Sequence, residues 1–153
     1  MSTPVIETKD TNLHLMSGKV PLQILKDINL RLDAGEVAAI VGPSGSGKTS
    51  LLMVLGGLER ATSGTVIVAG QDISKLSEDQ LAIFRRKNLG ILFQNFHLIP
   101  SMTALENVSL ALEIAETGTP LRDIREAATQ ALNEVGLGDR LTHLPSALSG
   151  GEQ

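Results

Sequence analysis

The chain has 153 residues, 42% of them hydrophobic, and a formal net charge of −4. This size and composition indicate one folded domain and exclude a disordered chain, while the negative charge argues against nucleic acid as the main partner. Cysteine is absent, which excludes disulfides and thiolate metal sites and suits a reducing compartment. The longest apolar runs are far shorter than the ~20 residues that span a bilayer, so we expect no direct membrane insertion.

The first half of the chain predicts strands around a glycine-rich loop. Apolar and polar residues alternate over residues 28–32, the pattern of a half-buried strand. Residues 36–41 form a short apolar run, as expected for a strand covered on both faces. Residues 49–58 predict a helix that stops at two glycines, and residues 65–69 predict another strand between turn signals. These elements together indicate an α/β core.

The next segment predicts a helix followed by a strand. Ser77 and Gln80 have the spacing of a capping box, which predicts a helix over residues 78–87. Residues 89–93 then predict a strand that ends at Gln94.

Two further helices are predicted downstream. Thr103 and Glu106 repeat the capping-box spacing ahead of a helix that runs to about Glu116, where Gly118 and Pro120 break it. The helix after that break has one apolar face, formed by Leu121, Ile124, Ala128, Ala131, Leu132 and Val135.

A complete phosphate-binding motif, G-x-x-x-x-G-K-[ST], lies between the predicted strand at residues 36–41 and the predicted helix. Its glycines let backbone N–H groups approach phosphate oxygens, and the helix directs its positive end at the same anion. Lys48 would neutralise the β- and γ-phosphates of ATP, and Thr49 would ligate Mg²⁺. A glycine-rich turn with a chance lysine is the disfavoured alternative. The expected nucleotide contacts are Gly42, Pro43, Ser44, Gly45, Ser46, Gly47, Lys48, Thr49 and Ser50.

The last residues carry a second glycine motif, Ser149-Gly150-Gly151, which alone could be an ordinary cap or turn. Together with the phosphate loop and Gln94, it resembles the signature, Walker A and Q-loop motifs of the nucleotide-binding subunits of ABC transporters. Their order and separations also fit, and the resemblance covers essentially the whole chain. Residues 93–100 and 105–108 further resemble the lipoprotein-releasing and macrolide-efflux ATPases of that family.

The resemblance implies an α/β fold of the P-loop NTPase class, with a RecA-like core, an antiparallel β subdomain and a helical subdomain. It divides a single ABC ATPase domain into a β and phosphate-loop core (1–95), a helical subdomain (96–145) and the signature (146–153). The family's Walker B aspartate, catalytic glutamate and switch histidine all lie beyond the signature. We therefore expect a C-terminally incomplete domain that is inactive by itself, poorly soluble or partly unfolded, and open at one strand edge.

The resemblance also implies roles for single residues. Gln94 would contact Mg²⁺ and the attacking water, and it would join Lys48 in catalysis. The family's usual aromatic contact to adenine is missing, and Leu15 is its expected replacement. The γ-phosphate of ATP held by the opposite subunit of a dimer would be bound by Ser149, Gly150 and Gly151.

The implied function is ATP binding and hydrolysis that drives transport by partner membrane permease subunits. The subunit would work as a homodimer, in the cytoplasm, docked peripherally on the cytoplasmic face of the cell membrane. Two alternatives stay open. One is a non-transporter relative that acts in DNA repair or on ribosomes, and the other is a fragment that binds nucleotide, or nothing, without turnover.

Overall fold

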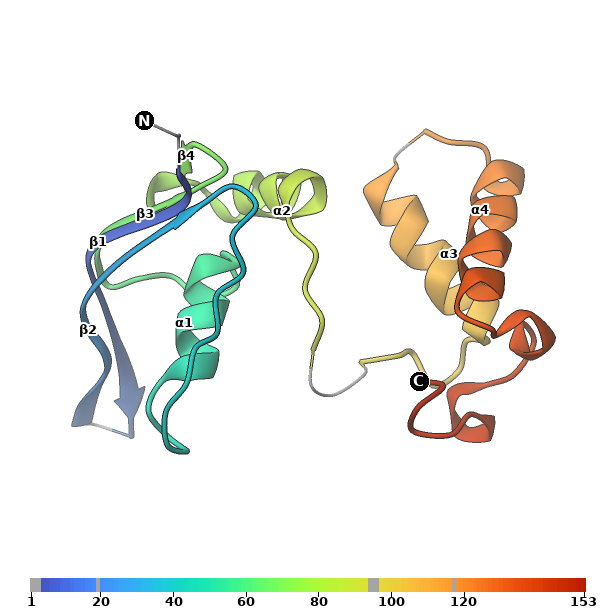
Figure 1. Ribbon diagram of the computed structural model, residues 1–153, viewed down its shortest axis with the longest axis horizontal. Coiled ribbons are helices and arrows are strands. Elements are labelled where there is room, and N and C mark those ends of the chain that lie inside the picture. Colours follow the sequence, from blue (N-terminus) through green and yellow to red (C-terminus); the bar gives the residue numbers. More distant parts are fainter. Residues whose placement is uncertain (1–3, 19, 94–96, 117) are drawn as a thin grey trace. The chain divides into compact units, whose positions relative to one another are not determined.

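The computed structural model describes residues 4–18, 20–93, 97–116 and 118–153. Contacts between its residues divide the chain into two compact units, Met1–Gly90 and Ile91–Gln153. The first unit contains a sheet with helices, and the second contains helices and turns (Figure 1).

The sheet of the first unit is antiparallel and has the strand order β2-β1-β3-β4. Strands β1 (Pro4–Ser17) and β2 (Val20–Asp33) form a long hairpin, in which Pro4 pairs with Asp33 and Ser17 with Val20. Strand β3 (Ser63–Val68) pairs with β1, and the short β4 (Gln71–Asp72) pairs with β3. The strand predicted at residues 28–32 is confirmed as part of β2, and the one predicted at residues 65–69 is confirmed as part of β3 except at Ala69, which lies in the turn after it.

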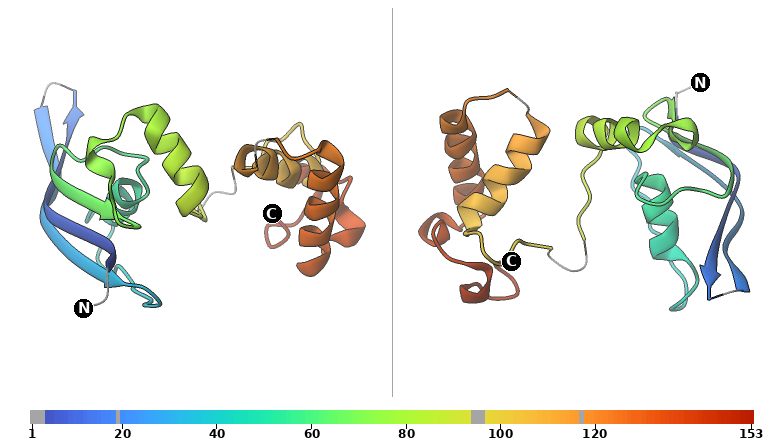
Figure 2. Two further views of the ribbon diagram at one scale, coloured as in Figure 1. Left: turned by 90° about the horizontal axis from the view of Figure 1, so that it is seen from above. Right: turned by 180° about the vertical axis from the view of Figure 1, so that it is seen from behind.

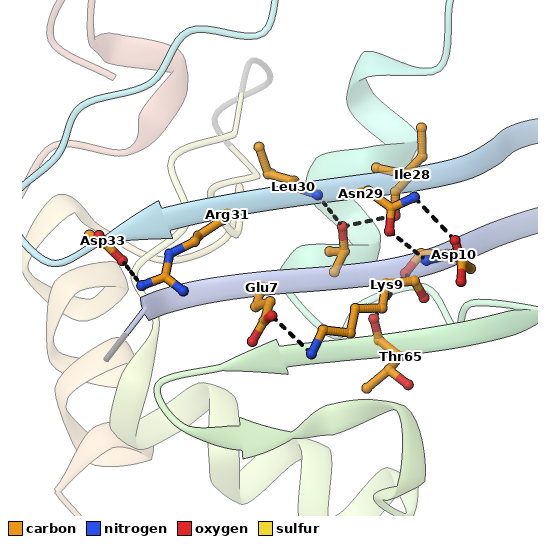
Figure 3. A network of polar contacts seen from close by, with 11 residues as sticks. Glu7, Lys9, Asp10, Ile28, Asn29, Leu30, Arg31, Asp33 and Thr65 are labelled. Carbon is orange, nitrogen blue, oxygen red and sulfur yellow. Dashed lines mark hydrogen bonds and ion pairs between the residues drawn. The ribbon is translucent and has the colours of Figure 1, made fainter. Parts of the chain in front are cut away.

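The hairpin is interrupted by bulges that side chains stabilise (Figure 3). Asp10 adopts a φ of 45°, and its N–H donates to Asn29 Oδ1 at 3.0 Å, while Asn29 Nδ2 donates back to Asp10 Oδ1 at 3.2 Å. The Thr8 hydroxyl is buried, donates to Ile28 O and accepts from the Leu30 N–H. Because these side chains replace missing ladder hydrogen bonds, the strands keep a defined register through the bulges.

Two helices accompany this sheet. Helix α1 (Lys48–Leu55) contacts β2 and β3, and helix α2 (Glu78–Asn88) follows a short 3₁₀ turn at Ile73–Lys75 (Figure 2). The capping box predicted for α2 is present, since the Gln80 N–H donates to Ser77 Oγ and the Ser77 N–H donates to Gln80 Oε1. The core between sheet and helices consists of Leu13, Leu25, Val54, Leu55, Val66, Val68, Ile73, Leu81 and Phe84.

The second unit has its own core. Helices α3 (Ala104–Ala115) and α4 (Leu121–Glu134) pack together and are followed by 3₁₀ turns at Gly138–Arg140 and Pro145–Ala147. The capping box predicted at the start of α3 is also confirmed. The buried residues of this core are Ala104, Leu105, Ala128, Leu132 and Leu148.

The predicted apolar face of α4 is correct at three of its six positions. Ile124, Ala128 and Leu132 are buried, whereas Leu121 and Val135 are about 70% exposed and Ala131 is exposed. The buried positions are four residues apart and form a narrow stripe along α4, from which Ala128 and Leu132 join the core with two residues of α3, Ala104 and Leu105.

Two strand predictions are wrong for the described residues. Residues 36–41 and 89–93 have no strand structure, and Val37, Val41 and Leu92 are almost fully exposed. A strand is stabilised by hydrogen bonds to a neighbouring strand, and no strand in the described part of the chain pairs with either segment. Both segments are therefore irregular and mostly exposed, except at Leu89, which packs against the core of the first unit.

Candidate functional site

The loop before α1 is shaped by glycines at positions that side chains resist. Gly45 and Gly47 have φ values of 81° and 86°, in the left-handed region that favours glycine. A Cβ on Gly47 would lie 2.9 Å from Ile24 O and 3.2 Å from Leu25 Cδ2. The loop thus rests directly on the backbone of β2, and that contact fixes where α1 begins.

The loop presents a row of backbone donors. The N–H groups of Gly45, Gly47, Thr49 and Ser50 donate to no protein acceptor within the described residues. Lys48 extends along the same loop, and its Nζ donates to the carbonyl oxygens of residues 42 and 43 at 3.0 and 2.7 Å. Convergent N–H groups, a helix N-terminus and an ammonium group are the donors that a polyphosphate requires. These residues therefore fit a nucleoside triphosphate.

A divalent cation would have few protein ligands here. Among the residues that the structure describes, no cluster of three His, Cys, Asp or Glu side chains could hold a metal ion. The exposed Thr49 hydroxyl at the start of α1 is an oxygen donor of the kind Mg²⁺ accepts, with phosphate oxygens and water completing its coordination. This donor set fits Mg²⁺ that arrives with the nucleotide.

The end of the β1–β2 hairpin adds an apolar surface near the loop. Leu15 pairs across the hairpin with Leu22, and both side chains are exposed, by 39% and 52%. Leu22 is two residues from Ile24, whose carbonyl lies beside Gly47. Sequence reasoning named Leu15 and missed Leu22, which the cross-strand pairing alone brings opposite it.

The second glycine motif forms a tight turn in the second unit. The Ser149 N–H donates to Glu152 Oε2 at 2.8 Å, and the Glu152 N–H donates to Ser149 O at 2.9 Å. Glu152 Oε1 accepts from Arg140 Nε at 3.3 Å. The hydrogen bonds from Ser149, followed by the one from Arg140, hold the pKa of the Glu152 carboxyl below its usual value. Arg140 and Glu152 were not predicted as site residues.

The turn is fixed from its other side by Gln153. Its Nε2 donates to Pro145 O at 2.7 Å and to Leu148 O at 3.1 Å. Leu148 itself is buried in the core of the second unit. The exposed glycines of the motif are therefore anchored at both ends.

The predicted site residues fall into separate groups. Residues 42–50 come together in the first unit, and Ser149, Gly150 and Gly151 come together in the second. Gln94 lies outside the described residues. Of the helices that the structure describes, none has the length and hydrophobicity required to cross a membrane.

Comparison with known proteins gives close relatives. The lipoprotein-releasing system ATP-binding protein LolD of Geobacter metallireducens is 46% identical over 149 residues, which are 97% of this chain and 65% of that protein. The macrolide export ATP-binding/permease protein MacB of Vibrio parahaemolyticus is 45% identical over 153 residues, all of this chain and 23% of that protein. The chain thus spans about a quarter of the macrolide exporter and about two thirds of the lipoprotein-releasing protein.

Solved structures agree with these relatives. A dimeric ATP-binding cassette in a post-hydrolysis state, bound to ADP and Pi, matches with a TM-score of 0.88 and 36% identity over 96% of this chain and 64% of that one. This likeness confirms the expected α/β fold of the P-loop NTPase class, with its antiparallel β and helical parts. A family profile described as ABC transporter matches residues 25–153. On this match and on the identities above, the chain belongs to the ABC transporter family.

Proposed function

We propose that this chain binds Mg²⁺-ATP through residues 42–50 and acts as the ATP-binding subunit of a membrane transporter. The observation that carries the proposal is the row of unpaired N–H groups at the start of α1, beside the Lys48 ammonium group. Each donor satisfies a phosphate oxygen without rearrangement of the backbone, because the glycines already hold the loop open. Lys48 then leaves the loop carbonyls for the β- and γ-phosphates.

The test is a calorimetric titration of the chain with Mg²⁺-ATP. Lys48→Ala should weaken binding roughly 10- to 100-fold, the effect of losing a hydrogen bond between charged groups. Lys87→Ala is the matched control, since that lysine is exposed at the end of α2. Equal affinity of the Lys48→Ala variant and the unmodified chain would contradict the proposal.

A second variant tests the metal contact separately. Thr49→Val keeps the branched shape of the side chain and removes the hydroxyl that would ligate Mg²⁺. It should reduce affinity for ATP in the presence of Mg²⁺ and leave affinity in EDTA unchanged. A similar loss in both conditions would show that Thr49 acts through the loop and not through the metal.

The partners follow from the relatives. The names of the relatives include ATP-binding and permease functions, and the cassette that bound ADP and Pi is a dimer. We propose that this chain pairs with a second ATP-binding subunit and that the pair docks on membrane permease subunits at the cytoplasmic face. In the dimer, Ser149, Gly150 and Gly151 would contact the γ-phosphate of the ATP held by the opposite subunit.

Hydrolysis requires more than the phosphate contacts. We propose that Gln94 contacts Mg²⁺ and the attacking water, within a domain organised as core (1–95), helical subdomain (96–145) and signature (146–153). The resemblance to the family implies that its catalytic carboxylate follows the signature motif. For the 153-residue polypeptide by itself we therefore propose binding without turnover, since a lost general base lowers the rate by about 10²–10⁴. A phosphate-release assay on this polypeptide tests this, and turnover abolished by Lys48→Ala would contradict it.

A further inference from the structure

The turn at Ser149–Gly151 has its outward side open. A Cβ added to Gly150 or Gly151 would meet nothing within 4 Å. In the described part of the chain, neither glycine N–H donates to a protein acceptor, whereas both the N–H and the hydroxyl of Ser149 interact with the Glu152 carboxylate. The two glycine N–H groups are available to a ligand that approaches from outside the subunit.

The same turn carries a negative charge directly behind these donors. Both oxygens of Glu152 are used, one by the Ser149 N–H and one by Arg140 Nε, and its side chain is 32% exposed. The first bond holds the turn closed, as the reciprocal bond of a capping box does at a helix start. The charge, however, opposes the approach of any polyphosphate, and among the described residues the guanidinium of Arg140 is the cation that pairs with it.

We propose that Arg140 and Glu152 are a matched pair of positioning residues for the ATP held by the opposite subunit. Glu152 fixes the Ser149 backbone so that the free donors face outward, and Arg140 cancels the charge that this clamp brings to the site. The inference rests on the proposed role of the glycine motif in the dimer. Arg140 lies on the 3₁₀ turn Gly138–Arg140, so the pair also ties the motif to the chain segment after α4.

The test uses two versions of the full 153-residue chain. A donor chain carries Lys48→Ala, so that it can offer only its glycine motif. An acceptor chain keeps Lys48 and carries Ser149→Arg, so that it can offer only a bound nucleotide. The affinity between labelled acceptor and donor is measured by fluorescence anisotropy with and without Mg²⁺-ATP. The new substitutions are placed in the donor alone, which leaves nucleotide binding by the acceptor unchanged.

This design distinguishes the role of Glu152 in holding the Ser149 backbone from the role of Arg140 in balancing the charge of Glu152. Arg140→Gln in the donor should weaken ATP-dependent association about fivefold, the size of one charge interaction near a protein surface. Glu152→Gln keeps an oxygen that accepts from the Ser149 N–H and removes the charge, so association should stay within about twofold of the parent. Glu152→Ala removes the clamp as well and should weaken association.

The double substitution decides between charge balance and a merely structural role. If Arg140 balances Glu152, the donor with Arg140→Gln and Glu152→Gln together should recover the association lost by Arg140→Gln alone. Circular dichroism of each donor confirms that it is folded. If the double variant is as weak as Arg140→Gln, or Arg140→Gln has no effect, the proposal is overturned.

The controls distinguish this proposal from the function on which it rests. An acceptor that binds no Mg²⁺-ATP in calorimetry would overturn the phosphate-loop proposal and this inference with it. An acceptor that binds ATP but never associates with the parent donor would overturn the role of the glycine motif and of the pair, and would leave the phosphate loop standing.

Discussion

Substitution of Gly47 by alanine should destabilise the first unit more than the same substitution at Gly45. Both residues have left-handed φ values, 86° and 81°, so both substitutions impose a similar backbone penalty of about 1–2 kcal/mol. Only at Gly47 would the new Cβ also overlap the protein, at 2.9 Å from Ile24 O and 3.2 Å from Leu25 Cδ2. At Gly45 it would meet nothing within 4 Å.

The difference between the two variants therefore isolates the contact between the loop and β2. We expect Gly45→Ala to lower the free energy of unfolding by about 1 kcal/mol and Gly47→Ala by about 3 kcal/mol, because relief of the overlap must move the loop off β2. Urea denaturation followed by NMR signals of the buried Leu25 and Val54 methyl groups reports on the first unit alone. Equal destabilisation by the two substitutions would refute the reasoning.

Two other predictions concern the second unit. Ala128 is fully buried and Ala131 is exposed on the same helix. Ala128→Leu should therefore lower the free energy of unfolding by about 1–3 kcal/mol, whereas Ala131→Leu should change it little. Urea denaturation of the two variants measures the difference. The Thr103 backbone N–H, followed by its hydroxyl, lowers the pKa of Glu106. The ionised Glu106 carboxylate therefore stabilises the folded state above about pH 4.5, the ordinary pKa of glutamate. This contribution to folding stability is lost as the pH falls through the lower pKa that Glu106 has in the folded state. Glu106→Gln should flatten the dependence of stability on pH in that range, and an unchanged dependence would contradict the assignment.

Short-range signals in the sequence determined the helices well. Capping boxes at Ser77 and Thr103 predicted the starts of α2 and α3, because a cap and the N–H it satisfies are three residues apart. The glycine motif likewise predicted the loop before α1, since left-handed backbone demands glycine wherever the loop lies. The roles of these loop residues in nucleotide binding stay predictions until the titrations are made.

Contacts between distant residues were decided only by the tertiary structure. The apolar pattern at residues 36–41 predicted a strand, but a strand needs a partner, and the described residues supply none. The pairing of Leu15 with Leu22 depends on the register of bulged strands, which alternation in the sequence does not fix. Arg140 and Glu152 are 12 residues apart in the sequence, and they meet because the chain between the 3₁₀ turn Gly138–Arg140 and the glycine motif folds back. The backbone hydrogen bonds of a helix join residues four apart, so the local sequence predicts a helix. The hydrogen bonds of sheets and the contacts of loops join residues that are distant in the sequence, so only the tertiary structure determines them.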